Sequence, residues 1–213
     1  MMGRNHIVVG ACALEHLWAL DRLVDRLDVP VLSDVQQALW AYLGIPKMTI
    51  PYMVICLGAY FLGSLLPDID HPDSILGRFV HIPVAHRTWL HSIYPYLLVL
   101  VFSLLGLYPV AAYVSSWPIP YMVTTIASTA GPILSWLFIG SFTHLFWDSF
   151  SAMGNCWFYK LLSDYKEYPS GAKIKKGHKL KLYHAGEWSE YVLVLVIVAF
   201  TVASFVYIER YWI

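Results

Sequence analysis

Long apolar runs alternate with short polar segments along the whole chain, and this pattern predicts a bundle of membrane helices. A helix that crosses a bilayer needs about 20 largely apolar residues. The first of the predicted helices is interrupted near its middle by Glu15 and His16, which must therefore face protein rather than lipid. The predicted spans are 5–23, 48–66, 91–114, 121–147 and 188–207.

The composition supports an integral membrane protein. Of the 213 residues, 58% are hydrophobic and only 13% are charged, whereas soluble domains carry about 25% charged residues. We therefore expect one integral membrane domain over residues 1–213. The formal net charge is zero, which argues against nucleic acid as the main partner. The three cysteines lack C-x-x-C spacing, so they predict neither a disulfide framework nor a cysteine zinc site.

The distribution of lysine predicts an orientation. The polar segment 155–187 carries seven lysines, and positive residues are retained on the cytoplasmic side of a membrane. This segment is therefore predicted to be a cytoplasmic loop within the domain. Five alternating spans then place the N-terminus and the segment 68–91 on the same side, with the C-terminus outside.

A polar cluster ends the second apolar run and points to a metal. Asp68 and Asp70 have D-x-D spacing, which suits a divalent cation, and His71 adds a nitrogen ligand. In such loops one carboxylate often binds the metal while the other orients a ligand, and we expect Asp70 to bind and Asp68 to support. The same residue types also make turns, so this run by itself leaves a structural role open.

The pair His144 and Asp148 is the second signal, because positions i and i+4 share one helix face. A pair of this kind alone is usually a hydrogen bond at a helix end. Here, however, the polar clusters of all five spans fall at one membrane face, where ionisable groups are costly unless paired, hydrated or metal-bound. The donor set favours zinc, with manganese or magnesium as alternatives, and allows two ions. The predicted ligands are His6, Asp68, Asp70, His71, His86, His91, His144 and Asp148, with Glu190 as a further ligand or general base.

Several strings of residues resemble the YdjM-like family. These are bacterial inner-membrane proteins described as membrane-bound metal-dependent hydrolases, and the resemblance runs from His6 to Glu190. It implies a helical fold in the inner membrane with a metal site at the cytoplasmic helix ends. The strings are Asn5-His6, Leu66-Pro67-Asp68-Ile69-Asp70-His71-Pro72, His86-Arg87-x-x-x-His91-Ser92, and His144-x-x-x-Asp148 followed by Gly154.

Two departures from the family pattern stand near these strings. Trp89-Leu90-His91 stands where a threonine usually precedes the histidine, and residues 149–154 replace the more usual Thr-Pro-x-Gly turn. Neither departure touches a predicted ligand. A more distant likeness, of ligand pattern only, is to zinc-dependent phospholipase C and its related nucleases, which points to phosphoester bonds.

These features favour an enzyme: a metal-dependent phosphoesterase acting on a lipid or lipid-linked phosphate at the inner leaflet. We assign catalytic roles to Asp68, Arg87 and Glu190, with Arg87 neutralising a substrate phosphate.

Two other functions remain open. A transporter for a divalent cation or a proton would use ionisable residues near the bilayer midplane, such as Glu15 and His16, with Gly58 and Gly63 loosening the second span. In a membrane scaffold, the metal would only tie helix ends together.

Overall fold

The chain folds into helices that match the predicted apolar segments. The computed structural model describes residues 3–27, 34, 36–37, 39–40, 43, 49–80, 82, 88–107, 121–151, 157, 165–166, 173–174, 182–184 and 187–211. The α-helices defined in this part of the chain are α1 (Gly3–Leu27), α3 (Ile50–Leu65), α4 (Tyr94–Leu107), α6 (Tyr121–Asp148) and α7 (Trp188–Tyr211). The prediction of a helical fold is confirmed, although residues 108–114 of the third predicted span lie outside the described residues.

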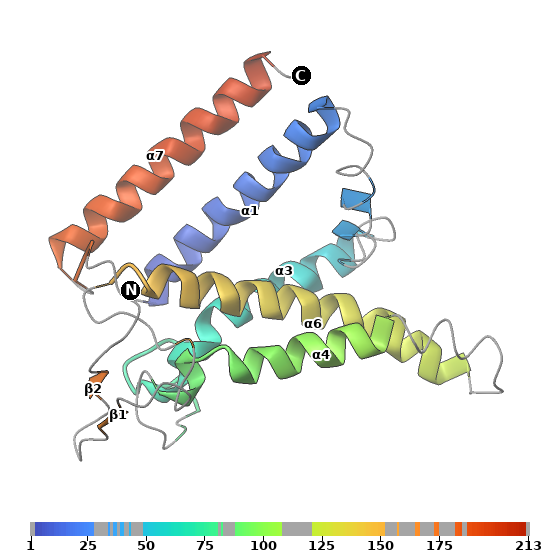
Figure 1. Ribbon diagram of the computed structural model, residues 1–213, viewed down its shortest axis with the longest axis horizontal. Coiled ribbons are helices and arrows are strands. Elements are labelled where there is room, and N and C mark those ends of the chain that lie inside the picture. Colours follow the sequence, from blue (N-terminus) through green and yellow to red (C-terminus); the bar gives the residue numbers. More distant parts are fainter. Residues whose placement is uncertain are drawn as a thin grey trace.

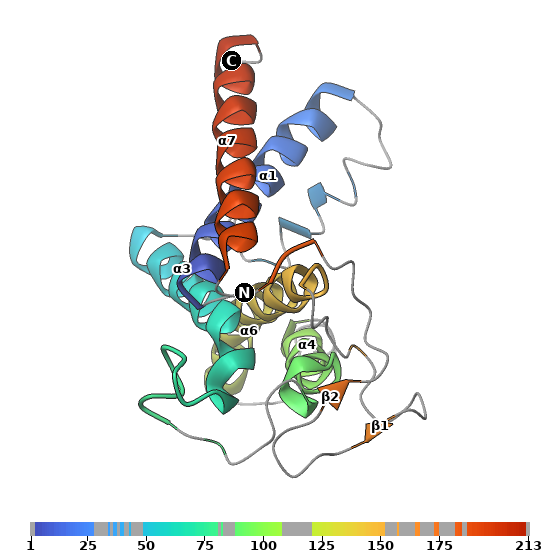
Figure 2. The ribbon, with the colours of Figure 1, turned by 90° about the vertical axis from the view of Figure 1, so that its left-hand side faces the viewer.

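The helices fan out from one end of the molecule. In Figure 1, α1 and α7 lie side by side and start near the N-terminus, while α3 and α6 end there and α4 starts there. Figure 2 shows α1 and α7 standing away from the second group, in which α3 and α4 both pack against α6. The five helix ends that carry the predicted ligands therefore meet at one end.

Short elements connect the helices at that end. The 3-10 helix η2 (Leu66–Asp70) continues α3 directly, and the 3-10 turn η3 (Trp89–His91) precedes α4. Within the predicted polar segment 155–187, β1 (Tyr165–Lys166) pairs antiparallel with β2 (Lys173–Ile174). Most other residues of that segment lie outside the described part of the chain.

Two glycines bring α3 and α6 into backbone contact. A Cβ atom on Gly63 would lie 2.1 Å from the carbonyl oxygen of Leu137, and one on Gly140 would lie 1.9 Å from that of Tyr60. Only glycine fits at such distances. Ser141 Oγ also donates to the Gly63 carbonyl at 3.1 Å. Gly63 therefore permits close packing in a continuous α3, instead of loosening the helix as the transporter hypothesis assumed.

Two described segments are long and apolar enough to cross a membrane. They are Ile50–Asp70 and Trp188–Tyr207, with mean hydropathies of 1.7 and 2.2, and Tyr94–Ser103 is a shorter apolar helix. Only 11% of the α7 segment is buried, and its exposed side chains include Leu195, Val196 and Phe200. An apolar helix with so little protein cover is typical of contact with lipid.

Candidate metal centre

Four buried side-chain atoms from three segments surround one point. His91 Nε2 lies 3.3 Å from Asp68 Oδ1 and 3.6 Å from Asp148 Oδ2. His144 Nε2 lies 3.5 Å from Asp68 Oδ1 and 3.6 Å from Asp148 Oδ2. Ligand atoms bound tetrahedrally to zinc at 2.0–2.2 Å are about 3.3–3.6 Å from one another. The ligand atoms of Asp68, His91 and His144 all lie within 4.8 Å of one another, so these three residues could hold a shared cation, with Asp148 beside them.

The main chain of α3 orients His144. Its Nδ1 lies 2.7 Å from the Ser64 carbonyl oxygen, which can only accept, so Nδ1 carries the proton and Nε2 presents its lone pair to the carboxylates. Nε2 is buried and makes no hydrogen bond within the described residues. A histidine that binds a metal almost always donates its other ring N–H in this way.

Pro67 explains why this carbonyl accepts from a side chain. In the 3-10 pattern that begins at Leu66, the donor to the carbonyl of Ser64 would be the N–H of residue 67. Proline has no N–H, so that acceptor is left for His144. Ser64 was not among the predicted site residues. Pro67, three residues later, is the signal in the sequence that could have identified it.

The D-x-D pair flanks His91 from both sides of its ring. Asp68 faces Nε2, whereas Asp70 Oδ2 lies 3.8 Å from Nδ1. We expected Asp70 to bind the ion and Asp68 to support it; among the described residues, Asp68 belongs to a group that could hold a metal and Asp70 does not. The reason is local: η2 turns by about 120° per residue, so residues 68 and 70 cannot point at the same place.

The turn that carries His91 is held in place by a hydrogen bond. Tyr96 Oη donates to the Leu90 carbonyl at 2.7 Å and so fixes η3 against α4. Neutral imidazole is the form in which His91 would bind a metal.

His6 brings α1 to the same centre. Its Nε2 lies 3.4 Å from Asp148 Oδ1, and its ring stacks on that of His144 with centroids 3.6 Å apart. His6, His144 and Asp148 form a second buried group that could hold a metal, beside Asp68, His91 and His144. The two oxygens of Asp148 thus face different histidines, as in a carboxylate that bridges two cations.

Three other predicted site residues are placed differently or not described. His71 is half-buried, and its Nδ1 accepts a hydrogen bond from the Asp73 backbone N–H at 3.2 Å. It belongs to neither of the buried groups found among the described residues. His86 and Arg87 lie outside the described residues.

Glu190 is a buried carboxylate that ties α7 to α1. Its Oε1 accepts a hydrogen bond from Asn5 Nδ2 at 2.6 Å. Asn5 precedes His6 in the chain, so the start of α7 is fixed beside the second group. Glu190 itself is not a member of either group.

Asp68 is the least buried of the residues in these groups. Its side chain is 11% exposed, whereas those of His6, His91, His144 and Asp148 are at most 1% exposed. Asp68 is therefore the member of these groups that is most exposed to solvent.

Comparison with known proteins gives a family for the chain. The family model described as YdjM inner membrane protein matches residues 1–213. The chain therefore belongs to the YdjM inner membrane protein family, which confirms the resemblance and, together with the two apolar segments, a membrane location. No curated protein and no solved structure matches it.

Proposed function

We propose that this member of the YdjM family is a metal-dependent hydrolase that cleaves phosphoester bonds of a lipid or lipid-linked substrate at the inner leaflet. The observation that carries the proposal is the set of four buried donor atoms of Asp68, His91, His144 and Asp148 at 3.3–3.6 Å. Buried carboxylates are costly unless their charge is compensated. A divalent cation would compensate two of them at once.

The donor set favours zinc, with manganese or magnesium as alternatives. In this proposal Asp68, His91 and His144 would hold one ion, and His6 and Asp148 would contribute to holding a second. When bound, such cations lower the pKa of a water molecule and stabilise charge on phosphoryl oxygens.

Catalysis requires an open position on the ion, and the buried group Asp68, His91 and His144 supplies only three donors, which would leave a tetrahedral ion a fourth position for water or substrate. A structural zinc site fills its coordination shell and is closed, whereas a catalytic site keeps a position open. Arg87 neutralises the substrate phosphate, and Glu190 accepts a proton from water; both roles remain predictions.

The position of the centre favours a lipid substrate. Asp68 lies near the C-terminal end of the candidate span Ile50–Asp70, and Glu190, near the start of the candidate span Trp188–Tyr207, is hydrogen-bonded to Asn5 beside His6. A site at that level meets lipid phosphates without extracting the lipid from the bilayer. The proposal includes five spans, with the N-terminus, the centre and the loop 155–187 on the cytoplasmic side.

One observation supports a second candidate, the transport of protons or divalent cations. Both carboxylate oxygens of Glu15 are buried and make no hydrogen bond with the described residues, and Oε2 lies 3.5 Å from His16 Nδ1. Ionisable groups in the middle of a span are often part of an ion pathway. Glu15 is far along α1 from the centre at His6, so Glu15→Gln separates the two functions. It should leave phosphate release unchanged, whereas a transporter would lose cation or proton flux into vesicles.

The test of the hydrolase measures metal content and phosphate release together. Purified wild type should carry zinc or manganese and release phosphate from phospholipids in a metal-dependent way. His144→Ala should lose metal and activity, because loss of one ligand removes much of the binding free energy. His184→Ala is the matched control, since this histidine is exposed and outside both groups.

The outcomes separate the candidates. If wild type binds metal but releases no phosphate from a broad panel of lipids with zinc, manganese or magnesium, the protein is a scaffold. If wild type and His144→Ala carry the same amount of metal, the assignment of the metal centre is contradicted.

A further inference from the structure

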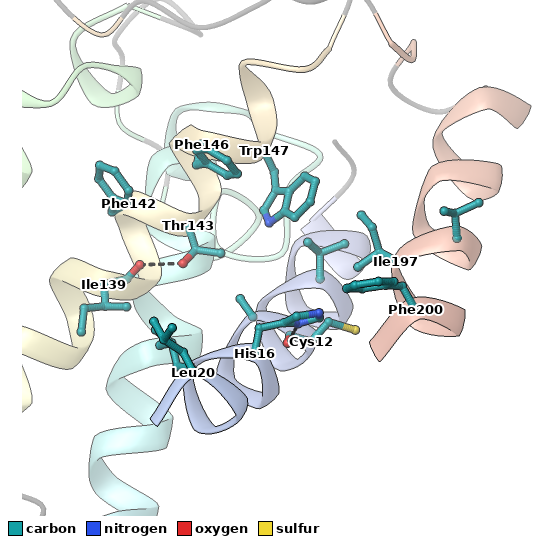
Figure 3. A pocket seen from close by; sticks show the side chains of 14 residues that line it. Cys12, His16, Leu20, Ile139, Phe142, Thr143, Phe146, Trp147, Ile197 and Phe200 are labelled. Atoms are coloured by element: carbon teal, nitrogen blue, oxygen red, sulfur yellow. Dashed lines mark hydrogen bonds between the residues drawn. The ribbon is translucent and has the colours of Figure 1, made fainter. Parts of the chain in front are cut away.

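A cavity of about 700 Å³ lies between α1, α6 and α7, beside the candidate metal centre. Figure 3 shows side chains from these three helices converging on it: Cys12 and Leu20 from α1, Phe142 from α6, and Ile197 and Phe200 from α7. The volume is within the range of pockets that hold small organic ligands.

The walls offer little to a polar ligand. The hydroxyl of Thr143 donates to the Ile139 carbonyl at 2.9 Å, and His16 Nδ1 lies 2.7 Å from the Cys12 carbonyl, so both groups already have partners. Most of the remaining lining is aliphatic or aromatic. Walls of this kind favour apolar occupants over polar ones.

The cavity is open at the surface where lipid is expected. Among the lining residues, Leu20, Val196 and Phe200 are exposed. The last two belong to α7, the most apolar of the candidate spans. The surrounding medium is therefore acyl chains, which can enter sideways between α1 and α7.

The inner end of the cavity is lined by residues that are close in sequence to members of the metal centre. Val9 lies one helical turn after His6 on α1, and Trp147 directly precedes Asp148 on α6. From Val9 to Leu20 the lining of α1 extends about 16 Å at 1.5 Å per residue. This is about half of the 30 Å hydrocarbon thickness of a bilayer, the depth of one leaflet.

We propose that this cavity binds an acyl chain of a phospholipid whose phosphate group lies at the metal centre. The inference rests on the proposed function for the identity of the reacting bond, and it adds the substrate class: long-chain lipid phosphates rather than short-chain or water-soluble esters. Apolar walls next to buried histidines and carboxylates match a molecule with an acyl tail and a phosphate head.

The test fills the cavity and follows a lipid probe. Ala13 lines the cavity, so Ala13→Phe places a ring inside it, and Leu17→Trp narrows it from a position where the exposed side chain has room to grow. Ala199→Phe is the matched control, because Ala199 is exposed on α7 and does not line this cavity. The probe is phosphatidic acid with a photoreactive diazirine in its palmitoyl chain, in phosphatidylcholine vesicles.

Binding is read by mass spectrometry of cross-linked peptides. Wild type and Ala199→Phe should cross-link within residues 9–20 and 139–147. In either cavity variant the cross-link yield at these residues should fall about tenfold. A misfit of this size in an apolar pocket weakens binding by a comparable factor. Unchanged cross-links at these residues in both variants overturn the inference, as does a wild-type adduct pattern that lies outside residues 9–20 and 139–147.

Kinetics separates this inference from the hydrolase proposal. Ala13→Phe should lower kcat/KM for dipalmitoyl phosphatidic acid about tenfold and leave the dibutanoyl ester unchanged. If no variant hydrolyses either ester but the cavity cross-links behave as expected, the hydrolase proposal fails and the acyl-chain site stands. The decisive quantity is the kcat/KM for the dipalmitoyl ester divided by that for the dibutanoyl ester. If this ratio is the same in wild type and Ala13→Phe, the cavity has no role in substrate choice.

Discussion

Replacing Gly140 by alanine tests whether the close approach of α3 and α6 builds the metal centre. A Cβ atom at this position would lie 1.9 Å from the Tyr60 carbonyl oxygen and 3.0 Å from the Ser64 nitrogen. Carbon–oxygen contacts between helices are about 3.3 Å or longer. The two helices must therefore separate by about 1.4 Å at this contact.

The shift reaches the centre because His144 lies one turn after Gly140 on α6. Its Nδ1 is 2.7 Å from the Ser64 carbonyl, and the added separation would take this distance to about 4 Å, beyond the range of a hydrogen bond. The His144 ring would lose the partner that fixes its orientation. We expect metal affinity to fall by about 10–100-fold, as it does when such orienting contacts are removed.

The free energy of unfolding should fall as well. Overpacking of a tight contact costs about 1–3 kcal/mol, and leaving a buried acceptor without its donor costs about 1–3 kcal/mol more. The higher helix propensity of alanine offsets only about 1 kcal/mol of this loss in the free energy of unfolding. The net destabilisation is therefore about 1–5 kcal/mol, which lowers Tm by roughly 2–4 °C per kcal/mol in a chain of this size.

Gly58→Ala is the matched control on α3. A Cβ atom there meets nothing within 4 Å, so only the propensity gain of up to about 1 kcal/mol remains. The assay is thermal unfolding in detergent with and without zinc, together with chelator competition for zinc. If Gly140→Ala unfolds at or above the wild-type temperature and keeps its zinc affinity, close helix approach is not what builds the centre.

Two further predictions address the ligands and the topology. Asp70→Asn should weaken metal affinity by only about 10–100-fold, since Asp70 orients His91, whereas Asp68→Asn should lose the metal because it replaces a ligand; chelator competition measures both, and equal losses would contradict the assignment. Reporter fusions after Gly171 and after Ile213 should read opposite sides of the membrane, because α7 crosses it between them, and a common side would contradict five alternating spans.

The pattern of apolar runs determined the helices and the end at which the chemistry collects. Each run is long enough to propagate a helix and is bounded by charged, proline or histidine residues. Alternating direction through successive helices then brings His6, His91, His144 and Asp148 to the same end, whatever the packing angles. For this reason the five helices defined in the described part of the chain, and the residues of the two buried groups, could be predicted from the sequence.

The division of roles within the D-x-D pair was decided by local geometry and packing. Sequence spacing alone treats residues 68–71 as a loop whose side chains can all turn to one point. Their continuation from α3 as a 3-10 helix instead sends Asp68 and Asp70 to opposite sides of His91 and leaves His71 beyond its end.

Contacts between segments far apart in the chain determined the hydrogen-bond partner of His144 and the presence of the cavity. The Ser64 carbonyl becomes the partner of His144 because Gly63 and Gly140 let two backbones touch, and Pro67 supplies no competing donor. The cavity beside the centre depends on where α7 lies against α1. Sequence fixes which residues are apolar, but whether their side chains fill a space or leave one is set by the angle and distance between packed helices.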